Sequence, residues 1–235
     1  MEELKIKKIY NQLEETIAKD LLEENEYPWE VLPKIKEYIK KLGAKLDSSK
    51  FEKRGEDVWI AKNAEIAPTA YISGPTIIDE EAQVRHCAYI RGGVIVGKKA
   101  VVGNSTEVKN AILFNEVQTP HYNYIGDSIL GYKAHMGAGS IISNLKSDKT
   151  NVIIKTKNQK VETNIRKMGA MLGSNVEVGC GSVLNPGTII GENSIIYPLS
   201  SVRGVVEKNS IYKNKNEIVE RKIKWGEKAD EDNTL

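Results

Sequence analysis

The chain is poor in the residues that mark several classes of protein. It has only two cysteines in 235 residues, Cys87 and Cys180, which is too few for a disulfide framework and has no zinc-finger spacing. The N-terminal residues MEELKIKK contain no apolar signal region, and no hydrophobic run approaches the length of a membrane span. We therefore expect a cytoplasmic protein with no membrane partner.

Charge of either sign is not in excess. The chain has 34 basic and 32 acidic residues and a formal net charge of +2. A nearly neutral chain gives no general argument for binding to a polyanion, so no nucleic-acid partner is expected.

The sequence does contain a period of six residues. Apolar residues stand six apart in two series, Ile60, Ile66, Ile72, Ile78, Val84, Ile90, Val96, Val102, Val108 and Phe114, then Leu172, Val178, Leu184, Ile190, Ile196 and Val202. A helix buries a residue about every 3.6 positions and a strand every 2, so a period of six requires the chain to turn one corner per hexapeptide. We therefore predict an all-β fold, a parallel β-helix shaped as a triangular prism.

The residues before and after the six-residue repeats predict two smaller regions, one on each side of the prism in the sequence. Two stripes at helical spacing precede it: Ile6, Tyr10, Leu13, Ile17 and Leu21, then Trp29, Leu32, Ile35, Ile39 and Leu42, up to Gly43. We predict that residues 1–50 form two helices that cap the first coil, since a solenoid exposes an apolar end; a partner-binding surface is the alternative. The prism is expected over 51–206, and a mixed-charge tail, part of it helical, over 207–235.

The period breaks between Phe114 and Leu172, and we expect the chemistry there. The polar aromatic segment from Pro120 to Tyr124 stands where an aliphatic residue would continue the pattern. An inserted loop is predicted at about 145–167, with seven basic and two acidic residues. Loops on a regular scaffold often carry sites, and this positive charge suits phosphate groups; a solvated hairpin is the alternative.

Three stretches in this region carry a resemblance to a known family: EVKNAIL, PHYNYIGDSILG and HMGAGSIISN. They resemble the GHLTYLGD-like and NIGAGTITCN-like segments of hexapeptide-repeat acyltransferases. The likeness, from about Arg91 to Pro198, is to the acetyltransferase half of the bifunctional N-acetylglucosamine-1-phosphate uridyltransferase and glucosamine-1-phosphate acetyltransferase, and to its archaeal sugar-phosphate relatives.

The resemblance implies a left-handed β-helix, a homotrimer, and acetyl-CoA as co-substrate between neighbouring prisms. The expected reaction is N-acetylation of an amino-sugar phosphate, with glucosamine 1-phosphate as the leading acceptor. The sequence has no counterpart of the family's G-x-G-T-R-M-like loop, so we do not expect nucleotidyl transfer from these residues.

The resemblance also implies roles for individual residues. His121 falls on the catalytic base, which takes a proton from the sugar amine. The acceptor side is expected to include Arg91, Lys109, Tyr124, His135 and Lys149, with Lys146 as a rival to Lys149. The cofactor side is expected to include Ala138, Asn144, Cys180 and Pro198, and backbone amides of residues 137–139 would stabilise the thioester oxyanion. No metal ligand is implied.

Three positions depart from the family pattern and keep other functions open. His135 replaces an asparagine that contacts the sugar, Leu145 replaces a tyrosine, and Cys180 replaces a serine near acetyl-CoA. One alternative is therefore a catalytically silent trimer that binds a sugar phosphate or nucleotide sugar. Another is a zinc enzyme like carbonic anhydrase, because three imidazoles, those of His86, His121 and His135, would suit such a site.

Overall fold

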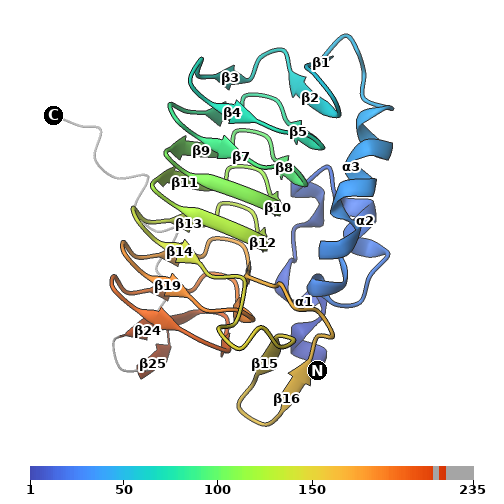
Figure 1. Ribbon diagram of the computed structural model, residues 1–235. Helices are drawn as coiled ribbons and strands as arrows, with labels where there is room; N and C mark the ends of the chain where they lie inside the picture. The colour runs from blue at the N-terminus through green and yellow to red at the C-terminus, as the bar shows by residue number, and fades with distance from the viewer. Residues whose placement is uncertain (214–216, 221–235) are drawn as a thin grey trace, which may run out of the picture.

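The structure, a computed structural model, describes residues 1–213 and 217–220. Short strands wind into stacked coils, and the strands of successive coils pair in parallel (Figure 1). Each coil contributes to three flat faces joined by corners. This is the predicted left-handed parallel β-helix, built from hexapeptide repeats.

From β3 onward each coil passes through three faces, which are numbered in that order. The first face contains β3 (Glu65–Ile66), β6 (Gln83–Val84), β9 (Val101–Asn104), β11 (Gln118–His121), β13 (His135–Met136), β18 (Glu177–Val178), β21 (Ile195–Ile196) and β24 (Ser210–Lys213). The second contains β4 (Tyr71–Ile72), β7 (Tyr89–Ile90), the first halves of β10 (Glu107–Leu113) and β12 (Tyr124–Leu130), β14 (Ile141–Ile142), β19 (Val183–Leu184) and β22 (Ser201–Val202). The third contains β2 (Val58–Ala61), β5 (Thr76–Ile78), β8 (Val94–Val96), the second halves of β10 and β12, β17 (Ala170–Leu172), β20 (Thr188–Ile190) and β23 (Val205–Val206), with β1 (Phe51–Lys53) antiparallel to β2.

The strand register agrees with the six-residue period except at one residue. Leu113, not Phe114, lies opposite Val96 and takes the inward position. Phe114 instead stacks on Tyr10 of the N-terminal segment, with ring centroids 5.3 Å apart. The predicted inward place of Phe114 is therefore wrong, because the coils in this region are one residue shorter and a fixed count of six slips after Val108.

The N-terminal segment is helical, as predicted, but it has three short α-helices instead of the two predicted ones. It also lies along a side of the prism rather than over the end of the first coil (Figure 1). It contains α1 (Ile6–Ile9), α2 (Lys19–Glu23) and α3 (Ile35–Gly43), with 3-10 turns at Glu2–Leu4, Leu13–Glu15, Pro28–Glu30 and Leu32–Lys34. Helix α3 packs against β5, β8 and β10, and the Tyr10 hydroxyl donates to the carbonyl of Ile129 at 3.1 Å.

The physical reason is the composition of the third face. Its outward side chains are apolar as well as its inward ones, so the whole face needs a cover to keep it from water. These outward residues, all 0–2% exposed, are Ile77, Ile95, Ile112, Ile129, Met171 and Ile189.

The predicted insertion leaves the corner between the second and third faces. It forms an antiparallel hairpin of β15 (Ile153–Lys155) and β16 (Lys160–Glu162). Val152 and Ile154 are fully buried, so the stem of the insertion packs on the prism and is not merely a solvated hairpin.

The described part of the tail is strand rather than helix. Residues 208–209 form a turn, and β24 pairs with β25 (Glu217–Glu220). Residues 214–216 and 221–235, for which a partly helical tail was also predicted, lie outside the described ranges. No helix in the described part of the chain combines the length and apolar character needed to cross a bilayer.

Candidate functional site

The corner between the first and second faces, called here the first corner, stacks the predicted base with predicted cofactor residues. Backbone hydrogen bonds between coils place these residues in one column: His86, Asn104, His121, Ala138, Cys180 and Pro198. The amide of Gly139 donates to the carbonyl of His121 at 3.0 Å, and that of Gly181 donates to Ala138 at 2.9 Å. Residues far apart in the sequence therefore lie one above another.

The turn after His121 is held by a buried asparagine. Asn123 is 3% exposed; its Oδ1 accepts from the His121 amide at 3.2 Å, and its Nδ2 donates to the Gly137 carbonyl at 2.8 Å. The backbone is thus fixed while the imidazole of His121 remains exposed to solvent. The role of Asn123 was not predicted, although it stands in a register otherwise filled by small side chains such as Thr106 and Ser140, and the longer amide was a signal for it.

The second face brings the predicted phosphate-side residues together. Strand register places Glu107 opposite both Tyr89 and Tyr124. The guanidinium of Arg91 lies 2.7 Å from a Glu107 carboxylate oxygen, and this hydrogen bond raises the pKa of Arg91. Arg91 remains exposed at this face.

A buried carboxylate, also not predicted, lies at the end of this group. Asp127 is 5% exposed, and it accepts hydrogen bonds from Lys109 Nζ at 2.9 Å, from Asn110 Nδ2 at 2.9 Å and from Asn144 Nδ2. Lys109 is therefore neither a free cation nor a solvated corner residue. Glu107 lies inside the stretch EVKN, and Asp127 lies inside the stretch YIGD. Their place in these two stretches was the sequence signal for both carboxylates.

Gly126 allows Tyr124 and Asn144 to approach each other. A Cβ at Gly126 would lie 2.7 Å from Asn144 Nδ2 and 2.8 Å from the Tyr124 hydroxyl, closer than side chains can pack. Burial raises the pKa of the Tyr124 phenol. The phenol is therefore protonated near neutral pH and can donate a hydrogen bond at this face.

Two predicted acceptor residues lie outside this group within one protomer. His135 lies on the first face, where its Nδ1 is 2.7 Å from Glu177 Oε2. It is opposite Gln118, three residues or about 10 Å along the strand direction from the corner of His121. Lys149 lies exposed in the insertion.

Comparisons with known proteins agree with this architecture. A family model described as the GMPPB C-terminal domain matches residues 72–166. A protein described as the uncharacterized acetyltransferase YaiX, from Escherichia coli strain 536, is 30% identical over 181 residues, which cover 74% of this chain and 76% of that protein. The chain belongs to the hexapeptide-repeat acetyltransferases.

Two further relatives of this acetyltransferase are bifunctional proteins. Bifunctional protein GlmU of Methanococcus aeolicus is 39% identical over 117 residues, which cover 50% of this chain and 28% of that protein. The bifunctional sugar-1-phosphate nucleotidylyltransferase/acetyltransferase of Sulfurisphaera tokodaii is 35% identical over 96 residues, 41% of this chain and 24% of that protein. The acetyltransferase spans less than half the length of such relatives.

The three histidines of the zinc alternative do not converge within this acetyltransferase. His86 lies two coils from His121, and its Nδ1 is 2.6 Å from the hydroxyl of Thr69, on the side away from His121. His135 is held by Glu177 on the first face, about 10 Å along the strand direction from the corner of His121. Among the described residues, no three His, Cys, Asp or Glu side chains gather as a metal-binding group.

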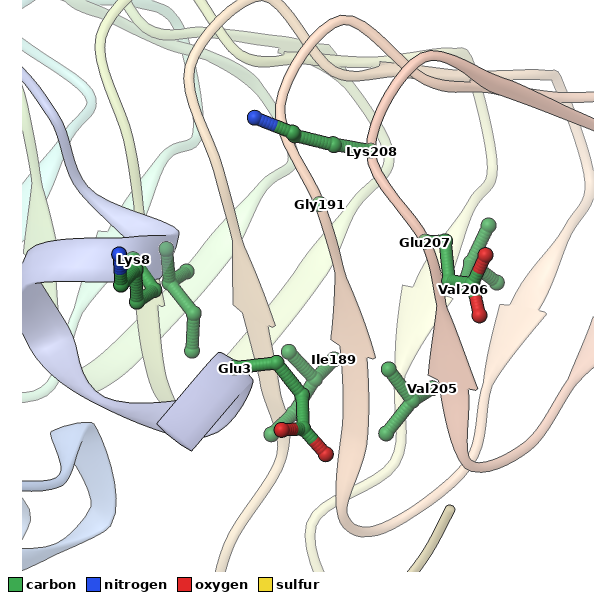
Figure 2. Close-up of a pocket in the computed structure, with 9 residues that line it drawn as sticks. Glu3, Lys8, Ile189, Gly191, Val205, Val206, Glu207 and Lys208 are labelled. Atoms are coloured by element: carbon green, nitrogen blue, oxygen red, sulfur yellow. The ribbon is translucent and has the colours of Figure 1, made fainter. Parts of the chain in front are cut away.

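A pocket of about 320 Å³ lies elsewhere on this acetyltransferase, between its N-terminal segment and its last coils (Figure 2). Its apolar lining includes Ile9, Ile189, Val205 and Val206, and its charged lining includes Glu3, Lys8, Glu207 and Lys208. The pocket opens at the third face, whereas the predicted site lies on the second face and the first corner.

Proposed function

We propose that this acetyltransferase moves the acetyl group of acetyl-CoA to the amine of an amino-sugar phosphate, with glucosamine 1-phosphate as the leading acceptor, in the synthesis of UDP-N-acetylglucosamine-type precursors. One observation carries the proposal: His121 shares a corner with Ala138, Cys180 and Pro198 and borders the face that holds Arg91, Lys109 and Tyr124. A base between a cofactor side and a phosphate side suits the transfer, because catalysis requires both reactants to be held in orientation.

In the proposed reaction, His121 acts as a general base. The sugar amine attacks the thioester carbonyl, and the neutral imidazole accepts the proton that the nitrogen releases. The tetrahedral intermediate then collapses to the amide and releases the CoA thiolate, with no covalent enzyme intermediate.

The oxyanion donor can be narrowed to one backbone amide. The amide of Gly137 already donates to Val178 at 2.7 Å, and that of Gly139 to His121 at 3.0 Å. Of the three amides predicted for this role, we therefore assign it to Ala138, which lies next to His121 in the corner column.

The acceptor phosphate would be held by Arg91, Lys109 and Tyr124. A guanidinium has five N–H donors, so the bond from Arg91 to Glu107 leaves others for phosphate oxygens. The Lys109 ammonium likewise has three donors, one of which is directed to Asp127. Charge-assisted bonds of this kind are roughly twice as strong as neutral ones.

A homotrimer is part of the proposal. Exposed apolar side chains gather on the second face and the first corner: Tyr71, Tyr89, Ile141, Val183 and Leu199. Burial against other copies would remove this surface from water. His135 and Lys149, which lie away from the group in one protomer, would then serve the site of a neighbouring copy.

The test is release of free thiol from acetyl-CoA with a panel of amino-sugar phosphates, glucosamine 1-phosphate first, using His121→Ala as the control. Acceptor-dependent release that disappears in the control would support the acetyltransferase and name its substrate class. No release with any acceptor from the folded protein would overturn the proposal and favour a silent sugar-phosphate binder.

A further inference from the structure

The corner between the second and third faces, called here the second corner, is turned by glycine in most coils. Gly92, Gly187 and Gly204 have φ of 84°, 79° and 85° there. Asn110 and Asp127 make the same turn with φ of 46° and 49°. Glycine adopts this left-handed conformation without steric cost, so the turn itself does not require a side chain at either position.

Burial of the Asp127 carboxylate also costs free energy of folding. A carboxylate removed from water is destabilising unless hydrogen bonds and opposite charge compensate it. Here the compensation comes from Lys109 and Asn110 in the coil before and from Asn144 after it. Of these donors, Lys109 belongs to the proposed phosphate group and Asn144 to the proposed acetyl side, and both meet Asp127 at the second corner, across the second face from His121.

We infer that Asp127 is a positioning residue of the acceptor site, an inference that rests on the proposed function. Its carboxylate fixes the Lys109 ammonium for the acceptor phosphate and the Asn144 amide for the acetyl side. A flexible lysine otherwise loses rotamer freedom when it binds a ligand, and a prior ion pair lowers that loss.

The rival explanation is a purely structural clasp. The backbone amide of Met168 donates to the Asn144 carbonyl at 3.0 Å, and that of Gly169 to the Asp127 carbonyl at 2.8 Å, so the same residues also close the base of the insertion. A structural clasp would affect the stability of the fold, but it would not distinguish acceptors with a phosphate from acceptors without one.

The experiment measures kcat/KM of the full chain for glucosamine 1-phosphate and for glucosamine, with Asp127→Asn as the variant. Asparagine keeps the shape and removes the charge. We expect the preference for the phosphorylated acceptor to fall about tenfold, through KM, as for the loss of one hydrogen bond to a charged group. An unchanged or increased preference in an active protein would overturn the inference alone.

Lys109→Met and the double variant show whether Asp127 acts through Lys109. Methionine keeps much of the lysine stem without its charge, so this variant should lose the same preference. The double variant should lose no more than either single one, because coupled residues are not additive. Additive losses would overturn the positioning role.

Asp79→Asn is the matched control, since Asp79 is 6% exposed but lies after β5 at the corner between the third and first faces. It should keep the full preference for the phosphorylated acceptor. An equal loss in this control would overturn the inference, because it would show that any buried carboxylate has the same effect. A wild-type protein that neither acetylates nor binds glucosamine 1-phosphate in calorimetry would overturn the proposed function itself.

Discussion

The second and third faces of the prism share one backbone plan but have opposite surfaces. Most outward positions on the third face are isoleucine or methionine and are buried, with Trp59 and Val205 at the others. Helix α3 packs against β5, β8 and β10 of this face. The equivalent positions on the second face include Tyr89, Glu107, Tyr124 and Ile141, none of them buried. The inward residue of each hexapeptide therefore specifies the coil, whereas the outward residue decides whether a face packs or is free to bind a ligand or another copy.

The largest expected effect is the loss of turnover in His121→Ala, with almost no loss of stability. If the edge of the second face holds the general base, turnover should fall about 10²- to 10⁴-fold. The imidazole is exposed, so the free energy of unfolding should change by no more than about 0.5 kcal/mol. Steady-state kinetics and chemical denaturation of the same preparation would check this; equal turnover in the variant would remove His121 from the mechanism.

A matched pair of isoleucines tests the comparison through stability. Ile95 lies outward on the third face with 0% exposure, and Ile141 lies outward on the second face with 41% exposure. Ile95→Ala should cost about 2–5 kcal/mol, because it leaves a cavity under the N-terminal segment. Ile141→Ala should cost less than about 1 kcal/mol in a separated protomer.

Urea denaturation would measure both costs, and light scattering would report the oligomer. Equal costs for the two alanine variants in separated protomers would contradict the contrast between the faces. If Ile141→Ala loses self-association and Ile95→Ala keeps it, copies of the chain meet at the second face.

The same contrast explains what the sequence could and could not predict. Inward positions repeat every six residues because the core allows little else, so fifteen of the sixteen predicted inward residues pair as expected, and only Phe114 slips. The outward isoleucines of the third face were also present in the sequence, but only at every third hexapeptide. An apolar residue at the outward position of every third hexapeptide indicates that this face is covered along its length.

The site was predicted in a similarly uneven way. Family motifs named Arg91, Lys109, Tyr124 and Asn144 as site residues, and the second face brings these four side chains close together. The resemblance assigned no role to Asp127, although Asp127 lies in the stretch YIGD, because a carboxylate that pairs with a cation is recognised only when the two coils are stacked. Loop residues such as Lys149 have no fixed register, so their place could not be read from the period.

A smaller effect is expected from the contact that fastens the cover to the third face. The Tyr10 hydroxyl, at a residue that is 1% exposed, donates to the Ile129 carbonyl at 3.1 Å. Tyr10→Phe keeps the ring and should lower the free energy of unfolding by about 1 kcal/mol. Tyr71→Phe is the control in separated protomers, since Tyr71 is 65% exposed on the second face there. Identical denaturation midpoints for the two variants would show that the Tyr10 bond contributes nothing.

The smallest expected change in stability comes from Asp79, a carboxyl group at the edge of the third face, and this change depends on pH. Burial raises the pKa of Asp79, and the hydrogen bond from the Glu80 amide at 2.7 Å only partly opposes this. The folded state thus binds this proton more tightly than the unfolded chain does. The stabilisation is complete below the unfolded pKa of about 3.9 and is lost as pH rises through the folded pKa.

Asp79→Asn should therefore raise Tm by about 1–2 °C at pH 7, and the difference should shrink as pH falls toward 4. Asp148→Asn has the opposite expectation, because hydrogen bonds from Thr150 lower the pKa of exposed Asp148 in the insertion. Its ionised form is favoured by folding, so the substitution should not raise Tm at pH 7. Thermal melts of both variants from pH 4 to 7 check the two signs together. Parallel curves for the two variants would contradict the distinction between a carboxylate at the covered face and one in solvent.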